Sequence, residues 1–595
     1  MLVTSYFGVK KLIIDVRELS FKYKGVKDKY ALKNINFSVS KGEFVVITGA
    51  SGAGKSTLLQ CLNGLIPHYQ KGLYSGEVII LNKNIREHRV GENVKEVGLV
   101  FQDFEAQLFS TNAALEILFG PENLNFSDEE MDKVIMEIFP AVCLSGLEDR
   151  APSSLSGGQK QRLAIGSILA IDPKIVCMDE PTTDLDPGGK LGIVNIIKDL
   201  QSKNDKTVIL VEHELEEIIT SDRIIVMNKG QIVLNDNSAN VLKEVEVLEA
   251  NGVFPLQVPL YFHKLGLAKE MLPLLPEEGV RLFKRLPINL DSNQYNKLIE
   301  NDKKRINTYK NVVLETIDLN YKYPDGSYAL QGIDIQIREN EFVAIVGHNG
   351  SGKTTLIKHL TGLIDTNHGN ILIRGKSVKE LTVFEIGQKI GLVFQNPDHQ
   401  IFSETVYEEV AFSLKLRGLS ENAINERVKE ALKVVNLSGY EDEDPFFLTK
   451  GERQRLAIAS VIAAESKIII LDEPTTGLDY HEQRQVMDLI KKLNKSGHTI
   501  IIITHVMWVV AEYAHRTLVM KDGEVALDGI TREILGKENL LKELSIRPPH
   551  ITEFSKLLGI TLLSVDEMLD CTNYGGVHSR KEEKCATLPE SQYSF

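Results

Sequence analysis

Cysteine is scarce in this sequence: the 595-residue chain has five cysteines, and no two of them form a CxxC pair. Disulfide frameworks need a dense set of cysteines, and iron–sulfur or structural zinc sites need closely spaced ones. All three kinds of site are therefore disfavoured. The cysteines are predicted to be free thiols or small buried residues in a reducing compartment. They are Cys61, Cys143, Cys177, Cys571 and Cys585.

Long apolar runs are also missing, since no stretch approaches the roughly 18–20 apolar residues that span a bilayer. The segment Met1–Lys11 lacks the apolar core and cleavage pattern of a signal peptide. The most apolar runs, Ile468–Leu471 and Ile500–Ile503, are short and bounded by polar residues. Such runs predict buried parallel strands, so any membrane role must come from a partner.

Basic charge is under-represented as well, because 82 acidic residues oppose 68 Lys and Arg and leave a net charge of −14. General nucleic-acid binding usually requires a basic surface, so no nucleic-acid partner is expected. The composition is otherwise that of a globular protein, with 43% hydrophobic residues. A single core stops growing near roughly 250–300 residues, so at least two domains are predicted.

The chain contains an internal repeat, because four pairs of matching residues recur in the same order at nearly one spacing. Gly49 and Gly347 are 298 positions apart, Gln102 and Gln395 293, Asp179 and Asp472 293, and His213 and His505 292. Chance matches would not keep one order and one spacing. The sequence therefore predicts a duplicated domain.

Each copy contains an apolar strand, a glycine-rich loop and a helix in succession. In the first copy these are Phe44–Thr48, the loop and Lys55–Leu62. This context is typical of a phosphate-binding loop, in which backbone N–H groups and the helix N-terminus face the phosphates. The loops are Gly49, Ala50, Ser51, Gly52, Ala53, Gly54, Lys55 and Ser56, followed by Thr57, and Gly347, His348, Asn349, Gly350, Ser351, Gly352, Lys353 and Thr354, followed by Thr355. The lysines are predicted to contact the β- and γ-phosphates, and Ser56 and Thr354 to bind Mg²⁺.

An acidic pair ends an apolar strand in each copy. Asp179 and Asp472 would be costly to bury without a counter-charge, which Mg²⁺ would supply. Glu180 and Glu473 follow them and are predicted to act as general bases on the attacking water. Gln102 and Gln395 are predicted to orient that water and touch the metal, and His213 and His505 to contact the γ-phosphate.

Leu155-Ser156-Gly157-Gly158-Gln159 matches the signature loop of ATP-binding cassette (ABC) ATPases, and the chain resembles such an ATPase with both cassettes fused, over residues 12–240 and 311–545. The resemblance implies an α/β fold with two tandem P-loop NTPase domains. Each would have a RecA-like core, an antiparallel β subdomain and an inserted helical subdomain, near 112–150 and 405–447. It also implies that Tyr23 and Tyr323 stack on the adenine rings of ATP.

The remaining regions carry no nucleotide motif. We expect a helical extension and linker over 241–310, and a C-terminal helical extension over 546–595 that ends in a polar tail from Cys571 onward.

In the ABC family each ATP site combines one cassette's phosphate loop with the other's signature, so the two cassettes are expected to pair within this chain. The second signature is altered to Leu448-Thr449-Lys450-Gly451-Glu452. Lysine in place of glycine is expected to hinder close approach to phosphate, although its ammonium could compensate in part, and Glu452 adds an anion. The site of Lys353 with Ser156, Gly157, Gly158 and Gln159 is therefore predicted to be the faster.

The segment Gln395–Phe412 is similar to the corresponding loop of energy-coupling-factor (ECF) ATPases, which energise import of vitamins and transition-metal ions, and Ile546–Glu553 is similar to their C-terminal region. This resemblance implies two membrane partners, a transmembrane coupling protein and a substrate-binding subunit, and a peripheral position on the cytoplasmic face. Phe104, Phe109, Ile401 and Phe402 would line grooves for the coupling protein, or else pack inside the helical subdomain. The alternative is a soluble paired-cassette ATPase acting on ribosomes, although the acidic charge and lack of cysteine clusters disfavour it.

The asymmetry of the two signatures predicts unequal effects of removing each base. Glu473→Gln should lower the steady-state ATPase rate more than Glu180→Gln, because the first acts in the site with the intact signature. Turnover of the two full-length variants measures this directly. A greater loss with Glu180→Gln would contradict the asymmetry.

Overall fold

The structure is a computed structural model that describes residues 11–25, 29–183, 185–204, 206–324 and 326–574. These residues group into two compact units. The first comprises Met1–Pro255, Gln395–Ala463 and Glu473–Leu489, and the second Leu256–Phe394, Ala464–Asp472 and Ile490–Phe595. Each unit holds one α/β core, and the first also holds a helical part of the second copy.

The first unit contains two sheets that share one hydrophobic core with α1 (Lys55–Asn63). The antiparallel sheet has the order β2 (Leu32–Ser40), β1 (Leu12–Tyr23), β4 (Gly72–Ile80) and β5 (Lys83–Asn84). The larger sheet has the order β10 (Gln231–Asn237), β9 (Arg223–Asn228), β3 (Phe44–Gly49), β8 (Thr207–Val211), β7 (Ile175–Asp179) and β6 (Val97–Val100). Strands β6 to β9 and β3 run parallel, and only β10 pairs antiparallel at the edge.

The central strands are short and fully buried. Every residue of β3, β7 and β8 is buried, which is the pattern of parallel strands covered on both faces. This confirms the strands predicted from the apolar runs. Their carboxyl ends meet along one edge, where ligands bind in such sheets.

The second unit repeats this design. Its antiparallel sheet has the order β13 (Tyr328–Arg338), β12 (Val312–Lys322), β15 (His368–Ile373) and β16 (Lys376–Ser377). Its six-stranded sheet has the order β17 (Ile390–Val393), β18 (Ile468–Asp472), β19 (Thr499–Ile503), β14 (Phe342–Val346), β20 (Arg516–Lys521) and β21 (Glu524–Ile530). Helix α13 (Lys353–Leu360) follows β14. The duplicated α/β architecture predicted from the repeat is confirmed.

Three main helices are inserted into each copy between the two strands at one end of the parallel sheet. In the first copy they are α4 (Ala113–Asn123), α5 (Asp128–Ala141) and α6 (Gly157–Leu169). In the second they are α15 (Val406–Leu416), α16 (Glu421–Val434) and α17 (Lys450–Ala463). Both sets belong to the first unit, and they confirm the helical character predicted for 112–150 and 405–447.

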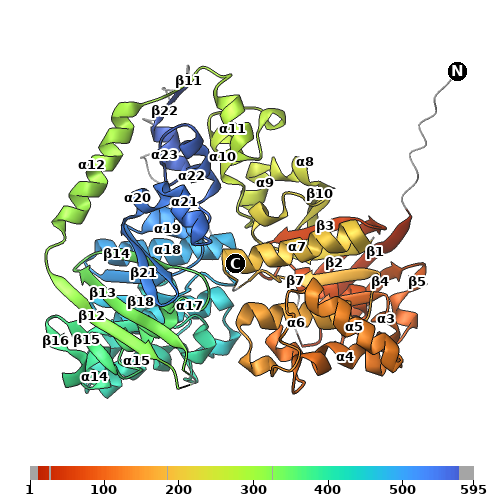
Figure 1. Cartoon of the computed structure of the whole chain (residues 1–595), viewed down its shortest axis with the longest axis horizontal. Coiled ribbons are helices and arrows are strands. Elements are labelled where there is room, and N and C mark those ends of the chain that lie inside the picture. The colour runs from red at the N-terminus through yellow and green to blue at the C-terminus, as the bar shows by residue number, and fades with distance from the viewer. Residues whose placement is uncertain (1–10, 26–28, 184, 205, 325, 575–595) are drawn as a thin grey trace. The chain divides into compact units, whose positions relative to one another are not determined.

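The region after β10 begins with α8 (Ser238–Leu242) and α9 (Val245–Ala250) and continues through α10 (Gln257–Lys264), α11 (Pro276–Phe283), β11 (Ile288–Leu290) and α12 (Ser292–Thr308) (Figure 1). The C-terminal part contains α22 (His550–Leu557), α23 (Val565–Asp570) and β22 (Thr572–Tyr574). The sequence suggested two separate extensions. In the second unit they fold together: β11 pairs antiparallel with β22, and Ile551 N donates to Gln257 Oε1 over 3.1 Å.

The duplication extends into this region. Helices α10 and α22 have eight residues each and start 293 positions apart, and their fifth residues, Tyr261 and Phe554, lie with ring centroids 5.7 Å apart. Equivalent elements of the two copies therefore pack on each other. Thr572–Tyr574 forms strand β22, so the expectation that the polar tail starts at Cys571 is wrong for these residues.

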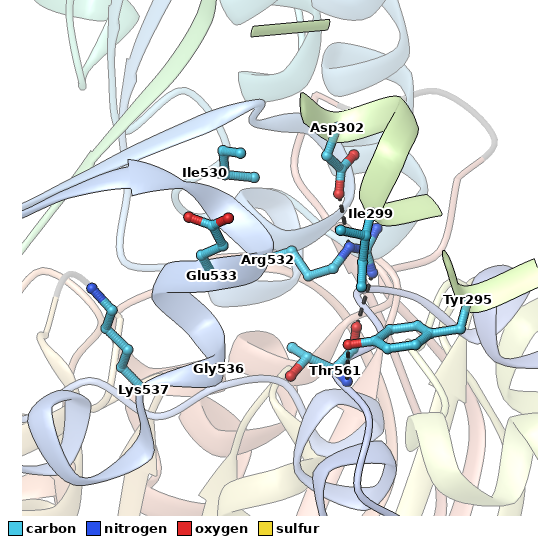
Figure 2. A pocket seen from close by; sticks show the side chains of 9 residues that line it. All are labelled: Tyr295, Ile299, Asp302, Ile530, Arg532, Glu533, Gly536, Lys537 and Thr561. Carbon is cyan, nitrogen blue, oxygen red and sulfur yellow. Dashed lines mark hydrogen bonds and ion pairs between the residues drawn. The ribbon is translucent and has the colours of Figure 1, made fainter. Parts of the chain in front are cut away.

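Arg532 joins three segments of the second unit, and Figure 2 shows its contacts with two of them, at Asp302 and Thr561. It lies in α20 (Thr531–Gly536), next to a cavity of about 390 Å³, and is only 5% exposed. Its Nε donates to Asp302 of α12 over 2.7 Å, its Nη1 to the carbonyl of Thr561 over 2.9 Å, and both Nη atoms to Glu567 of α23 over 2.7 Å. The linker helix and the C-terminal extension are thus tied to the second copy through one guanidinium.

The cysteine prediction is confirmed for the described residues: Cys61, Cys177 and Cys571 are buried, Cys143 is exposed, and all four are free. Cys585 lies outside the described residues. So do most of Met1–Lys11 and the tail beyond Tyr574, on which sequence predictions were also made.

Replacing Arg532 with methionine should loosen the paired extensions. Two largely buried carboxylates would lose their counter-charge, which costs about 3 kcal/mol when one partner of a buried pair is removed. Hydrogen exchange of α10 and α22 in the full chain measures the loss. The control is Lys542→Met, which removes an exposed pair with Glu538 worth under about 1 kcal/mol. Equal effects of the two substitutions would contradict the role given to Arg532.

Candidate nucleotide-binding and catalytic site

The first phosphate loop leaves β3 and enters α1 through glycines that no other residue could replace. Gly49 and Gly54 have φ of 144° and 100°, and a Cβ on them would overlap the carbonyl oxygens of Met227 and Ala31. The loop therefore curls tightly, as loops that bind phosphate through backbone N–H groups do.

Lys55 is buried and folds back over this loop. Its Nζ donates to the carbonyl oxygens of Gly49 over 2.9 Å and Ala50 over 3.0 Å. Burial lowers the pKa of Lys55, against the opposing charges of carboxylates that include Glu180 and Asp179. The second loop repeats this geometry, since Lys353 Nζ donates to Gly347 O and His348 O over 2.8 Å each.

Asp179 is the last residue of β7, at the edge of the sheet next to the loop. Burial raises its pKa to about 6, and a hydrogen bond from Ser56 opposes the rise. Its Oδ1 is buried and finds no hydrogen-bond partner among the described residues. A buried carboxylate oxygen beside a hydroxyl suits a hard divalent cation, so Asp179 and Ser56 fit the predicted Mg²⁺ site.

Glu180 is held from two sides by residues that are distant in the sequence. Gln102 Nε2 donates to Glu180 Oε2 over 2.8 Å, and His213 Nε2 lies 2.8 Å from Oε1. Burial alone would raise the pKa of Glu180, but the hydrogen bond and charge of His213, with the charges of Lys55 and Lys450, lower it. The carboxylate is thus kept ionised and oriented, as a general base requires.

The backbone at both predicted bases is strained. Glu180 has φ of 49° and Glu473 has φ of 48°, in the left-handed region that non-glycine residues rarely adopt. Such strain costs on the order of 1–3 kcal/mol and persists mainly at functional positions. The same strain at matching positions supports one role for the two glutamates.

Glu212 was not singled out by the sequence, although it belongs to this site. Its buried carboxylate accepts a hydrogen bond from the Thr182 hydroxyl and from His213 N, the latter over 2.8 Å. Glu212 therefore positions the loop of His213. The signal that could have revealed it is a carboxylate directly after an apolar strand.

The second copy places its site residues at the same points of the fold. Asp472 ends β18, and His505 comes two residues after β19, in the second unit with Lys353. Glu473 is buried and Gln395 exposed, and both belong to the first unit. Their roles stay predictions.

The two tyrosines of the predicted adenine contacts are fixed to the helices that follow the loops. Tyr23 OH lies 3.0 Å from Thr57 Oγ1, and Tyr323 OH lies 2.9 Å from Thr355 Oγ1. Each ring also meets a neighbouring aromatic edge-on, Phe21 for Tyr23 and Tyr321 for Tyr323. The rings are thus held near the phosphate loops, and stacking on adenine stays a prediction.

Both signatures form capped helix N-termini. Ser156 N donates to Gln159 Oε1 over 2.9 Å, and Gln159 N donates back to Ser156 Oγ over 3.3 Å. In the second copy Thr449 N donates to Glu452 Oε2 over 2.7 Å, and the return bond is 3.2 Å. Glu452 therefore caps the N-terminus of α17. The sequence analysis had considered it only as an added anion.

A loop of the second copy contacts the first phosphate loop within the first unit. Asp479 Oδ2 accepts a hydrogen bond from Ser51 N over 3.0 Å. The sequence analysis did not predict this contact. Residues of the two copies therefore contribute together to the surroundings of the Lys55 loop.

These features define the class of the protein: a nucleoside triphosphatase with two phosphate loops. Each copy also has an acidic pair at the end of a parallel strand, with strained backbone at the glutamate. The family model described as ABC transporter matches residues 32–183 and 330–476. A relative from Caldanaerobacter subterraneus subsp. tengcongensis, provisionally named an ABC transporter ATP-binding protein, is 54% identical over 94% of this chain and 98% of its own. A similarly named relative from Methanosarcina acetivorans is 40% identical over 90% of this chain and 89% of its own.

Among solved structures, cbiO1 from Clostridium perfringens, described as part of the ABC transporter complex cbiONQ, is 37% identical. It covers 42% of this chain and 100% of its own, with a TM-score of 0.37. The chain belongs to the ABC transporter family, as an ATPase subunit with two ATP-binding domains. Among the residues that the structure describes, no helix has the length and apolar character needed to cross a membrane.

Two substitutions at Tyr23 distinguish the contribution of the ring to ATP binding from that of the hydroxyl. If the ring stacks on adenine, Tyr23→Ala should weaken ATP binding about tenfold, whereas Tyr23→Phe should change it by less than about threefold. Calorimetric titration of the full chain measures both, with Tyr69→Ala as an exposed control. Equal losses for Tyr23→Phe and Tyr23→Ala would assign the effect to the hydroxyl contact with Thr57.

Proposed function

We propose that this chain energises an ECF-type importer of a vitamin or a transition-metal ion by binding two short helices of a transmembrane coupling protein. The observation that carries the proposal is a pair of exposed aromatic side chains that recurs in the two copies. Phe109 and Phe119 meet edge-on at 4.6 Å, and Phe402 and Phe412 meet edge-on at 4.7 Å. The two pairs occupy positions 293 residues apart.

These aromatic pairs are costly to leave in water. Phe109 is 63% exposed and Phe402 is 61% exposed. Exposed apolar patches on a folded protein usually mark interaction surfaces. Identical patches on the helical parts of the two copies suit a partner that presents one apolar helix to each.

A buried carboxylate supports each pair. Glu116 accepts hydrogen bonds from Phe109 N over 3.0 Å and Ser110 N over 2.7 Å. Glu409 accepts them from Phe402 N over 3.1 Å and Ser403 N over 3.0 Å. The exposed conformation of Phe109 and Phe402 is therefore held by the fold.

Not every residue suggested for these grooves suits that role. Ile401 is buried and Phe104 is partly buried, so for Ile401 the alternative of packing inside the protein is correct. Phe119 and Phe412, which the sequence analysis did not name, join Phe109 and Phe402 instead.

In this function the two ATP-binding domains, 12–240 and 311–545, pair within one chain and alternate between closed and open states. Glu180 and Glu473 accept the proton of the attacking water, Gln102 and Gln395 orient that water, and His213 and His505 contact the γ-phosphate. Asp179 with Ser56, and Asp472 with Thr354, would hold magnesium, which would neutralise charge on the phosphates. The loop of Lys353 works with the signature of Ser156. The chain acts at the cytoplasmic face of the membrane through its partners, the coupling protein and a substrate-binding subunit.

Co-purification from the native host tests the proposal. The tagged full chain should bring down a polytopic membrane protein, and Phe109→Ser with Phe402→Ser should reduce its recovery about tenfold or more, because two hot-spot aromatics are lost. Tyr328→Ser, equally exposed, is the matched control and should have no effect. Recovery of ribosomal proteins without any polytopic membrane protein would favour the translation-factor alternative and refute the importer. Uptake of labelled vitamins and of cobalt or nickel into lipid vesicles that contain the purified complex then identifies the cargo.

A further inference from the structure

The altered signature of the second copy brings a lysine to the first phosphate loop. Lys450 is the first residue of α17 and occupies the position that Gly157 occupies in α6. Its side chain is partly buried. Both Lys450 and the loop Gly49–Ser56 belong to the first unit, so their surroundings can be compared directly.

The lysine side chain lies over Gly477. This glycine has φ of 68°, and a Cβ on it would overlap Lys450 Nζ. The first copy has the reverse arrangement in sequence, with Gly157 in the signature and Asp184 at the position of Gly477. The second copy thus has glycine in place of the acidic Asp184 and lysine in place of Gly157. Gly477 leaves room for the side chain of Lys450.

Two observations place Lys450 in the surroundings of the first nucleotide site. Two residues after Gly477, Asp479 is bonded to Ser51 N in the phosphate loop over 3.0 Å. Lys450 is also one of the cations whose charge acts on Glu180. Lys450 therefore lies over the loop whose Asp479 contacts Ser51 N, within reach of the charge on Glu180.

The carboxylates around this site would favour a further cation besides Lys55 and the predicted Mg²⁺. The buried Lys55 faces Glu180, Asp179, Asp479 and Glu212. A triphosphate would add further negative charge to these four carboxylates. A lysine supplied from the other copy offsets part of that charge in a partly buried place, where charge-assisted hydrogen bonds are strong.

We propose that Lys450 is a phosphate ligand of the first nucleotide site, donating from Nζ to the terminal phosphate of the nucleotide held on the loop Gly49–Ser56. The altered signature then makes this site one that retains ATP, rather than a merely weakened copy of the other. The view of Lys450 as an obstacle to phosphate makes the opposite prediction, because removing the side chain would improve binding.

The test uses the full chain with Lys353→Ala, which weakens binding at the other loop, and titrates it with a non-hydrolysable ATP analogue and Mg²⁺. Lys450→Met keeps the length of the side chain and removes the charge, and it should weaken binding about tenfold. Lys450→Arg should stay within about threefold of the parent, since it keeps a cation there. Lys429→Met, an exposed lysine on α16, is the control and should have no effect. The loss should also shrink at high salt.

Unchanged or tighter binding by Lys450→Met would overturn the proposal. The same titrations are repeated with Lys353 intact, in case Lys353→Ala does not abolish binding at the other loop. Two classes of binding site should then be present, and Lys450→Met should weaken only one of them.

A double-mutant cycle with Gly477→Ala provides an independent readout. The added Cβ should displace the ammonium and weaken binding in the Lys450 chain, but cause little further loss in Lys450→Ala. Backbone strain at Gly477 is present in both backgrounds and cancels in the cycle. Equal losses in the two backgrounds would contradict a phosphate contact by Lys450.

Discussion

The buried charge of Lys55 is the constraint on which the first nucleotide site depends. This ammonium is removed from water at the edge of a sheet and faces four carboxylates, those of Asp179, Glu180, Glu212 and Asp479. Buried charges are tolerated only when each is paired or hydrogen-bonded. Each charge at this edge of the sheet has such a partner. The glycine loop provides carbonyl oxygens to Lys55 Nζ, and Gln102 and His213 form hydrogen bonds with Glu180. Asp179 Oδ1 remains as the natural point for a magnesium ion.

The two copies have retained these elements of the nucleotide site and differ in the residues that surround them. Both copies have a phosphate loop of the same pattern, a strained glutamate at the matching position and an exposed aromatic pair. Two differences between the copies concern contacts outside the copy itself. Lys450 occupies the position of Gly157 in the signature, and Arg532, which contacts the linker helix, occupies the position of Ala239. The first change is proposed to alter the charge at a nucleotide site. The other ties α12 and α23 to the second copy. The predicted difference between the two sites would thus follow from few substitutions.

Much of the fold and of the site could be predicted because its requirements are local. Glycines at positive φ, short fully apolar strands and an acidic residue at a strand end each leave a pattern within a few residues. The repeat at one spacing then excluded chance. For this reason the strands β3, β7 and β8, the phosphate loops and the helical insertions agree with the sequence predictions. The paired extensions were missed because their repeat carries no nucleotide motif and few identical residues.

The sequence by itself determined the fold class, the two phosphate loops and the chemistry that they can perform. Only the tertiary structure decided which distant residues meet. Ser51 and Asp479 are 428 positions apart, and neither has a local pattern that demands the other. The course of Lys450 over Gly477, the support of His213 by Glu212 and the pairing of Tyr261 with Phe554 are of the same kind. Such contacts depend on how whole elements pack, because burial and charge are shared among segments that the linear sequence keeps apart.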